Sequence, residues 1–139
     1  MNTKAILAAF AGAVFSFLGG WVIFGMLLMD FYTANTATYE GLSKGPMPDL
    51  VFIFLSGLCS SFLLTVIYTK WANVETFSAG FTNGLIVYFF FAASMDLAMY
   101  AFYNLANMTL TIVDIIAQTV FGGVVGGIIG AVLGMGKKS

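Results

Sequence analysis

The segment MTLTIVDIIAQTVFGGVVGGIIGAVLGM, residues 108–135, decides the fold. It is longer than the roughly 20 apolar residues with which a helix crosses a bilayer, and its only charged residue is Asp114. Glycine recurs at every fourth position of its second half, which places several glycines on one face of a helix. Small residues in that arrangement let a second helix approach closely inside a membrane. The segment therefore predicts a transmembrane helix that packs tightly against a neighbour.

Three further apolar runs lie upstream and predict three more transmembrane helices. The four predicted helices span residues 5–29, 50–69, 76–102 and 108–135. The polar stretch 30–49 contains Gly45, Pro46 and Pro48, which break helices, so it predicts an outer loop. Residues 1–139 thus predict a single transmembrane domain, an all-α four-helix bundle with up-down topology.

The composition supports the same fold class and excludes several functions. The chain has 139 residues, 60% of them hydrophobic and only 8% charged, with a mean hydropathy of +1.00. Lipid is the solvent that such a composition suits. The five lysines form no basic stripe, so we expect no nucleic-acid partner. With no histidine and a single cysteine, Cys59, the chain lacks a Cys-His nucleophile and a Cys/His metal cluster. Cys59 is interpreted as a small buried side chain, and we expect no cofactor.

Lysine positions predict the orientation of the helices, because cytoplasmic loops retain Lys and Arg. With four spans, Lys4, Lys70, Lys137 and Lys138 fall on one side and Lys44 alone on the other. Both termini are therefore expected in the cytoplasm. The opposite, outer side carries most of the carboxylates and tyrosines.

Small residues indicate how the helices pack. We call the small residues of the last helix the glycine face; its main row is Gly122, Gly126, Gly130 and Gly134, with Gly123 and Gly127 beside it. The first helix carries a looser row of Gly12, Ser16 and Gly20, and the second offers Gly57 and Ser61. We expect these faces to meet. The glycine face either packs only within one bundle or also joins protomers as a glycine zipper, and the sequence leaves both possibilities open.

Polar residues near the outer ends of the last two helices form the candidate site. Asp96 is followed on one helix face by Tyr100, Asn104 and Asn107, and Asp114 lies one turn from Gln118. Asp inside a membrane is costly, so both carboxyl groups should face the bundle or a wet cavity.

Several roles remain open for this site. Its oxygens suit a hard cation, although the metal is unknown; the two carboxyl groups suit a shared proton in a relay; or the site recognises a substrate in an outward cavity. The alternative is structural: Asn107 or Thr109 caps the last helix, Asp114 favours the positive N-terminal end of that helix, and a tyrosine binds Asp96.

The chain also resembles a known group of proteins. The residues that carry this resemblance are Phe17-Leu18-Gly19-Gly20-Trp21 with Gly25, Met29-Asp30-Phe31, Gly80 with Gly84, and Val113-Asp114. They are similar to an uncharacterised family of small four-helix bacterial inner-membrane proteins, a domain of unknown function found in Bacteroidetes-like genomes. The resemblance covers nearly the whole chain. It implies the fold and a multi-pass location in the bacterial cytoplasmic membrane, and it transfers no catalytic residue.

Three functional hypotheses follow. The first is a non-enzymatic membrane subunit that self-associates, or joins another membrane protein, through its glycine face within the lipid bilayer. The alternative is a small transporter or channel with an outward-facing acidic ion or proton site at Asp96 and Asp114. A membrane enzyme that uses these carboxylates on a lipid-like substrate is a third, less supported hypothesis.

Overall fold

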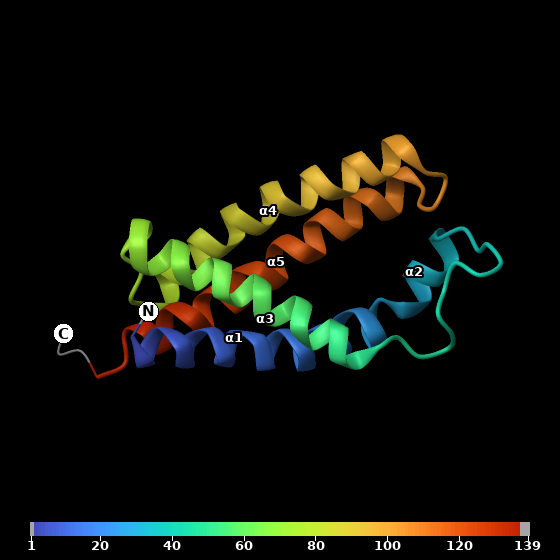
Figure 1. The fold of residues 1–139 in the computed structure, drawn as a ribbon. Helices are drawn as coiled ribbons and strands as arrows, with labels where there is room; N and C mark the ends of the chain where they lie inside the picture. The colour runs from blue at the N-terminus through green and yellow to red at the C-terminus, as the bar shows by residue number, and fades with distance from the viewer. Residues whose placement is uncertain (1, 137–139) are drawn as a thin grey trace.

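The computed structural model describes residues 2–136 and is all-α in this range (Figure 1). Four of its helices are long and apolar enough to cross a membrane, which confirms the predicted fold class. The helices are α1 (Thr3–Val22), α2 (Met29–Asn35), α3 (Leu50–Ile67), α4 (Phe77–Phe102) and α5 (Met108–Leu133), with wider π-type turns at Ile23–Leu27 and Tyr68–Ala72. The two ends of the described chain lie at the same end of the molecule, as an up-down topology requires.

Side-chain caps define where three of the helices begin. The amide N–H of Ala5 donates to Asn2 Oδ1 at 2.8 Å, and that of Ala79 donates to Thr76 Oγ1 at 3.1 Å. The Asn107 side chain accepts in the same way at the start of α5. Such caps satisfy amide groups that have no partner within the first turn.

One helix of the structure lies inside a predicted loop. Residues 30–49 were expected to be irregular, but α2 occupies Met29–Asn35. No apolar periodicity predicts this helix, because α2 buries no residue of its own. It is held instead by contacts with the N-terminal end of α5.

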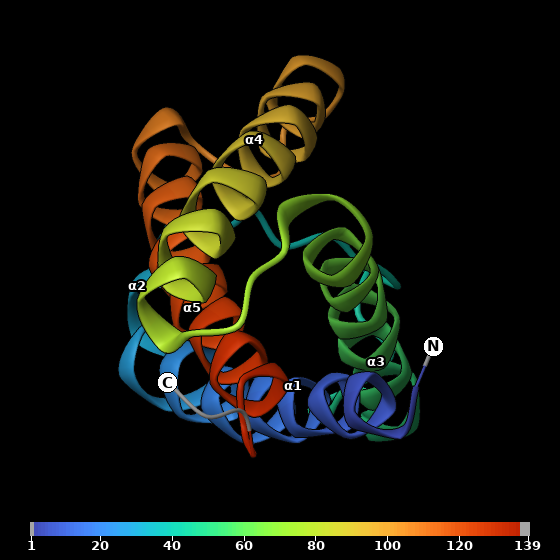
Figure 2. The same ribbon diagram turned by 90° about the vertical axis from the view of Figure 1, so that its left-hand side faces the viewer.

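The long helices pack as two pairs, α4 with α5 and α1 with α3, and the contact of α1 with α5 joins the pairs. α4 lies along α5 for most of its length, while α1 packs against both α3 and α5. α3 and α4 are consecutive in the chain, yet Figure 2 shows them diverging from their connecting turn. The buried core therefore lies between α1, α3 and α5, around Leu64, Tyr68, Val125 and Ile129. Cys59, interpreted from the sequence as buried, is exposed on α3.

The glycine face of α5 is covered by α4. A Cβ at Gly80 of α4 would collide with the carbonyl group of Gly126, and one at Gly84 would collide with that of Gly122. Gly130 meets the backbone of Thr76 and Gly80 in the same way. The sequence predicted a contact with the first two helices instead. The difference arises because Gly80 and Gly84 let the backbone of the preceding helix come closest.

The small residues of α1 make separate contacts. A Cβ at Gly12 would lie 2.8 Å from Ile129 Cδ1 and 2.9 Å from Ser61 Oγ, so this glycine is needed where α1, α3 and α5 meet. Ser16 lies against Gly57 of α3, and Gly20 has only ordinary contact space. Gly134, the last glycine of the main row, lies against the backbone of Glu75 in the α3–α4 turn, and Lys4 Nζ donates to the carbonyl of Met135 nearby. Lys137 and Lys138 lie outside the described residues.

Candidate functional site

The α4–α5 hairpin brings the two predicted aspartates together. Asp96 and Asp114 are equally distant in sequence from Leu105, which lies in the turn between the helices. At 1.5 Å per residue, each aspartate lies about 9 Å from the outer end of its helix. Each helix has 26 residues and so measures about 39 Å, against roughly 30 Å of hydrocarbon. The pair therefore lies nearer to one boundary of the hydrocarbon than to its centre.

The two carboxyl groups have unequal surroundings. Asp96 and Asp114 lie close enough for their side chains to interact. The hydroxyl of Tyr32, which α2 carries, donates a hydrogen bond to Asp114 Oδ1. Asp96 Oδ2 is buried and has no hydrogen-bond partner among residues 2–136. Asp114 is thus supplied with a donor, while Asp96 keeps an oxygen that can accept a further one.

Tyr32 is a neutral donor in this arrangement. Burial raises the pKa of its phenol, and the hydrogen bond to Asp114 and the negative charges of Asp114 and Asp96 raise it further. The phenol therefore keeps its proton at any physiological pH. A neutral phenol beside a carboxylate is a hydrogen-bond donor whose acceptor is charged, which is among the stronger kinds of hydrogen bond.

A partly open cavity of about 230 Å³ adjoins the pair. Its walls are Tyr32, Asp96, Met99, Tyr100, Leu105, Ala106, Leu110, Thr111 and Asp114. Since one water takes up about 30 Å³ of the liquid, this volume suits about seven waters or one small solute. Tyr32 is the only wall residue outside the stretch 96–114, so α2 closes one side of a cavity that the hairpin otherwise forms.

The structure separates the predicted site residues into two groups. Tyr100 lines the cavity together with the two aspartates, whereas Asn104, Asn107 and Gln118 do not. The carbonyl of Asn104 accepts a hydrogen bond from Tyr39 at 3.0 Å. Gln118 is half-buried one turn beyond Asp114 on α5. These three residues lie around the cavity and not in its wall.

Asn107 has a structural role at the start of α5. Its Oδ1 accepts from the amide N–H of Leu110 at 2.8 Å, and its Nδ2 donates to Asn35 Oδ1 at 2.6 Å. The carbonyl of Asn107 also accepts from the hydroxyl of Thr111, at 3.0 Å. Both side-chain functions of Asn107 are therefore used within the protein.

Sequence reasoning missed Tyr32. The sequence placed this tyrosine on the outer face but gave no reason to pair it with Asp114, because the two residues are far apart in the chain and 30–49 was expected to be a loop. The only available signal was a short run of helix-compatible residues before Thr36.

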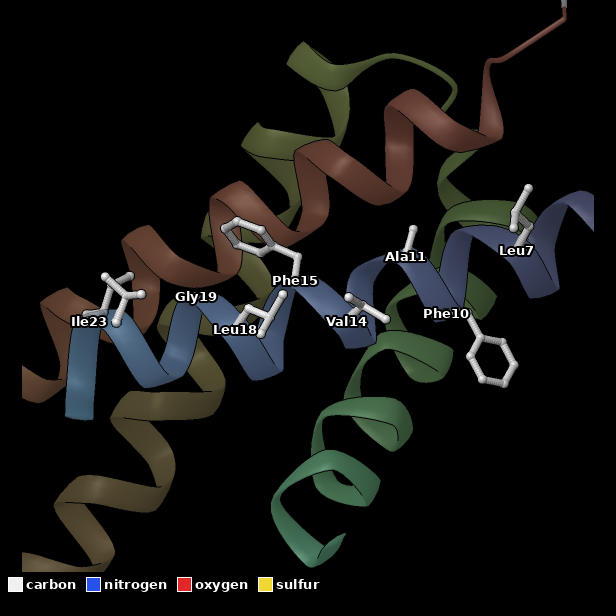
Figure 3. A pocket seen from close by; sticks show the side chains of 9 residues that line it. Leu7, Phe10, Ala11, Val14, Phe15, Leu18, Gly19 and Ile23 are labelled. Carbon is white, nitrogen blue, oxygen red and sulfur yellow. The ribbon is translucent and has the colours of Figure 1, made fainter. Parts of the chain in front are cut away.

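A larger hollow on the described part of the chain is of a different kind. It lies along α1 and measures about 880 Å³. Its walls are wholly apolar, as the side chains of Leu7, Val14 and Leu18 in Figure 3 illustrate. It offers nothing to a charged solute, and acyl chains of the bilayer suit such a surface.

No family model, no curated protein and no solved structure matches this chain. The site must therefore be interpreted from its own chemistry. Among residues 2–136, no three His, Cys, Asp or Glu side chains lie together as ligands for a metal ion. What the geometry provides is a pair of carboxyl groups, a phenol donor and a small cavity.

Proposed function

We propose that this chain is a multi-pass protein of a bacterial cytoplasmic membrane that binds a proton or a small monovalent cation at Asp96 and Asp114. In this proposal the protein is a non-enzymatic transporter or channel component. The observation that carries the proposal is the contact between two carboxyl groups from neighbouring helices, beside a cavity, inside the membrane-spanning part of the chain.

Electrostatics favours a positive ligand at this pair. Two unit charges 4 Å apart repel each other by about 4 kcal/mol at the effective dielectric constant near a protein surface. A charged Asp at the centre of the membrane costs a further 2.5 to 3.5 kcal/mol or so, and less near the interface. A proton or a cation between the carboxyl groups removes most of both costs. Within the described residues, the cavity wall contains no lysine that would do the same.

The binding proposal has more structural support than self-association through the glycine face. The glycines of that face are in contact with α4 in the same chain. A second copy would have to displace α4 to reach them.

The proposed orientation places the site on the outer side. Lys4 and Lys70 lie at the same end of the bundle. This is the end at which the chain begins and at which α3 is connected to α4. If this end is cytoplasmic, as lysine retention favours, the carboxyl pair faces the opposite compartment. Protons or cations would then reach it from outside the cell.

Thermal stability in detergent tests the proposal. The purified protein would be heated in Na⁺, K⁺ and Li⁺ solutions and across pH, alongside Asp96→Asn, Asp114→Asn and the control Asp30→Asn. Asp30 is an exposed carboxylate on α2. We expect a ligand-dependent rise in melting temperature that both site variants lose and the control keeps. A rise of equal size in all four proteins would refute binding at the pair.

A further inference from the structure

Residues 28–39 form a strap across the outer end of the molecule; we call this segment the outer cover. Its hydrogen bonds with the hairpin are made to Asn104, Leu105, Asn107 and Asp114. Besides the bond from Tyr32 to Asp114, the amide N–H of Ala37 donates to the carbonyl of Leu105 at 2.7 Å. Thr36 pairs with Ala106 in an antiparallel bridge. The cover is therefore attached to the part of the hairpin that surrounds the cavity.

The backbone at both ends of the outer cover has features that suit a hinge. Leu28 has φ −103° and ψ 0°, outside the helical region, and separates the π-type turn after α1 from α2. On the other side, Gly41 and Gly45 have positive φ angles of 77° and 148° and no neighbour within 4 Å of a built Cβ. Residues 38–53 are exposed throughout. The cover can thus move without disturbing a transmembrane helix.

We propose that the outer cover gates the carboxyl pair, with Tyr32 as its latch. This inference rests on the proposed function, because it assigns a regulator to that same site. The Tyr32 hydroxyl occupies one oxygen of Asp114, and its side chain forms one wall of the cavity. A proton or cation arriving from outside competes with this hydroxyl, and the cover opens when the hydroxyl leaves. Tyr32 is thereby a positioning residue that acts through Asp114.

Cysteine labelling measures the gating directly. In a Cys59→Ser background, Asp96→Cys would be reacted with a small, charged methanethiosulfonate reagent in proteoliposomes. Tyr32→Phe removes the latch hydroxyl but keeps a ring that can pack against Phe24, whose centroid lies 5.9 Å away. We expect Tyr32→Phe to raise the labelling rate about tenfold, as expected when a hydrogen bond to a charged acceptor is lost. The control Tyr103→Phe removes an exposed hydroxyl at the end of α4, outside the cavity wall, and should leave the rate unchanged.

A disulfide across the bridge provides the opposite test. The Cα atoms of bridged antiparallel residues lie about 4.5 to 5.5 Å apart, within the range that a disulfide spans. Thr36→Cys with Ala106→Cys, oxidised by copper phenanthroline before labelling, should slow the labelling of Asp96→Cys relative to the equally treated protein that keeps Thr36 and Ala106. Mass spectrometry would verify the pairing. This lock also decides the question if Tyr32→Phe does not fold.

The outcomes separate the gate from the binding site. Equal labelling rates in the protein that keeps Tyr32 and in Tyr32→Phe would overturn the gate. Equal rates in the disulfide-locked protein and in the equally treated protein that keeps Thr36 and Ala106 would overturn it too. Labelling does not depend on whether the wild-type pair binds a cation. A cation-dependent melting shift with insensitive labelling would therefore refute the gate alone. Latch-dependent labelling without any melting shift would confirm that the cover closes and refute the proposed function on which its role depends.

Discussion

Replacing Gly126 by alanine should loosen the contact between α4 and α5. A Cβ at this position would lie 2.9 Å from the Cα of Gly84 and closer still to the carbonyl oxygen of Gly80 and the hydroxyl of Tyr68. Carbon atoms pack comfortably at about 3.5 to 4.0 Å. Because two of the three obstacles are backbone atoms of α4, no side-chain rotation relieves the overlap. The two helices must move apart.

The expected magnitude follows from two opposing terms. Inserting a methyl group into a packed interface costs about 1 to 3 kcal/mol. Alanine favours a helix over glycine by up to about 1 kcal/mol. With the full helix gain subtracted, the net loss for Gly126→Ala should be between about 0 and 2 kcal/mol. The control Gly20→Ala faces only Phe121 Cζ, at 3.8 Å, so it should be neutral or stabilising by up to about 1 kcal/mol.

Unfolding in mixed micelles provides the assay. Each protein would be titrated with sodium dodecyl sulfate, and helix content and tryptophan fluorescence would both be recorded, so that the two-state assumption is checked. We expect the two variants to differ by about 2 kcal/mol in free energy of unfolding, the sum of the loss at one site and the gain at the other. Equal stability of Gly126→Ala and Gly20→Ala would refute the close packing of the hairpin.

Three further predictions concern the cap, the phenol and the orientation. Asn107→Ala removes the cap of α5 and its bond to Asn35, so thermal unfolding should show a loss of about 1 to 2 kcal/mol, whereas an unaffected midpoint would exclude the cap. Burial raises the pKa of Tyr32, so the stabilisation that depends on its neutral phenol is complete below the unfolded pKa of about 10 and declines above it. Denaturant midpoints should therefore fall less steeply with alkaline pH in Tyr32→Phe than in the wild type. Equal slopes would contradict this. Reporter fusions should place the C-terminus in the cytoplasm and an insertion at Gly45 outside, and the reverse pattern would overturn the orientation.

The sequence was sufficient to predict the four long apolar helices. Long uncharged runs have no other stable solution in lipid, because each backbone polar group needs a partner within the segment. Asp96 and Asp114 could be placed at one depth because a short turn separates their helices. The structure then places both in the wall of one cavity, together with Tyr100.

The sequence was not sufficient to predict which helices pack against each other. Small residues occur on every long helix, so the glycine face had several possible partners, and only the backbone geometry at Gly80 and Gly84 shows that α4 is chosen. The contact of Tyr32 with Asp114 could not be predicted from the sequence for a related reason. Its helix buries nothing by itself and depends on contacts with a part of the chain far away in sequence.

The measurement that tests the central claim most directly is the infrared difference spectrum of the protein in lipid, recorded on raising the pH and on adding a monovalent cation. A protonated carboxyl group has a C=O stretching band that a carboxylate lacks. We predict a band that weakens under either change and is absent from the Asp96→Asn/Asp114→Asn double variant. A spectrum with no such band in the wild type, or with the same band in the double variant, would contradict a proton or cation shared by this pair.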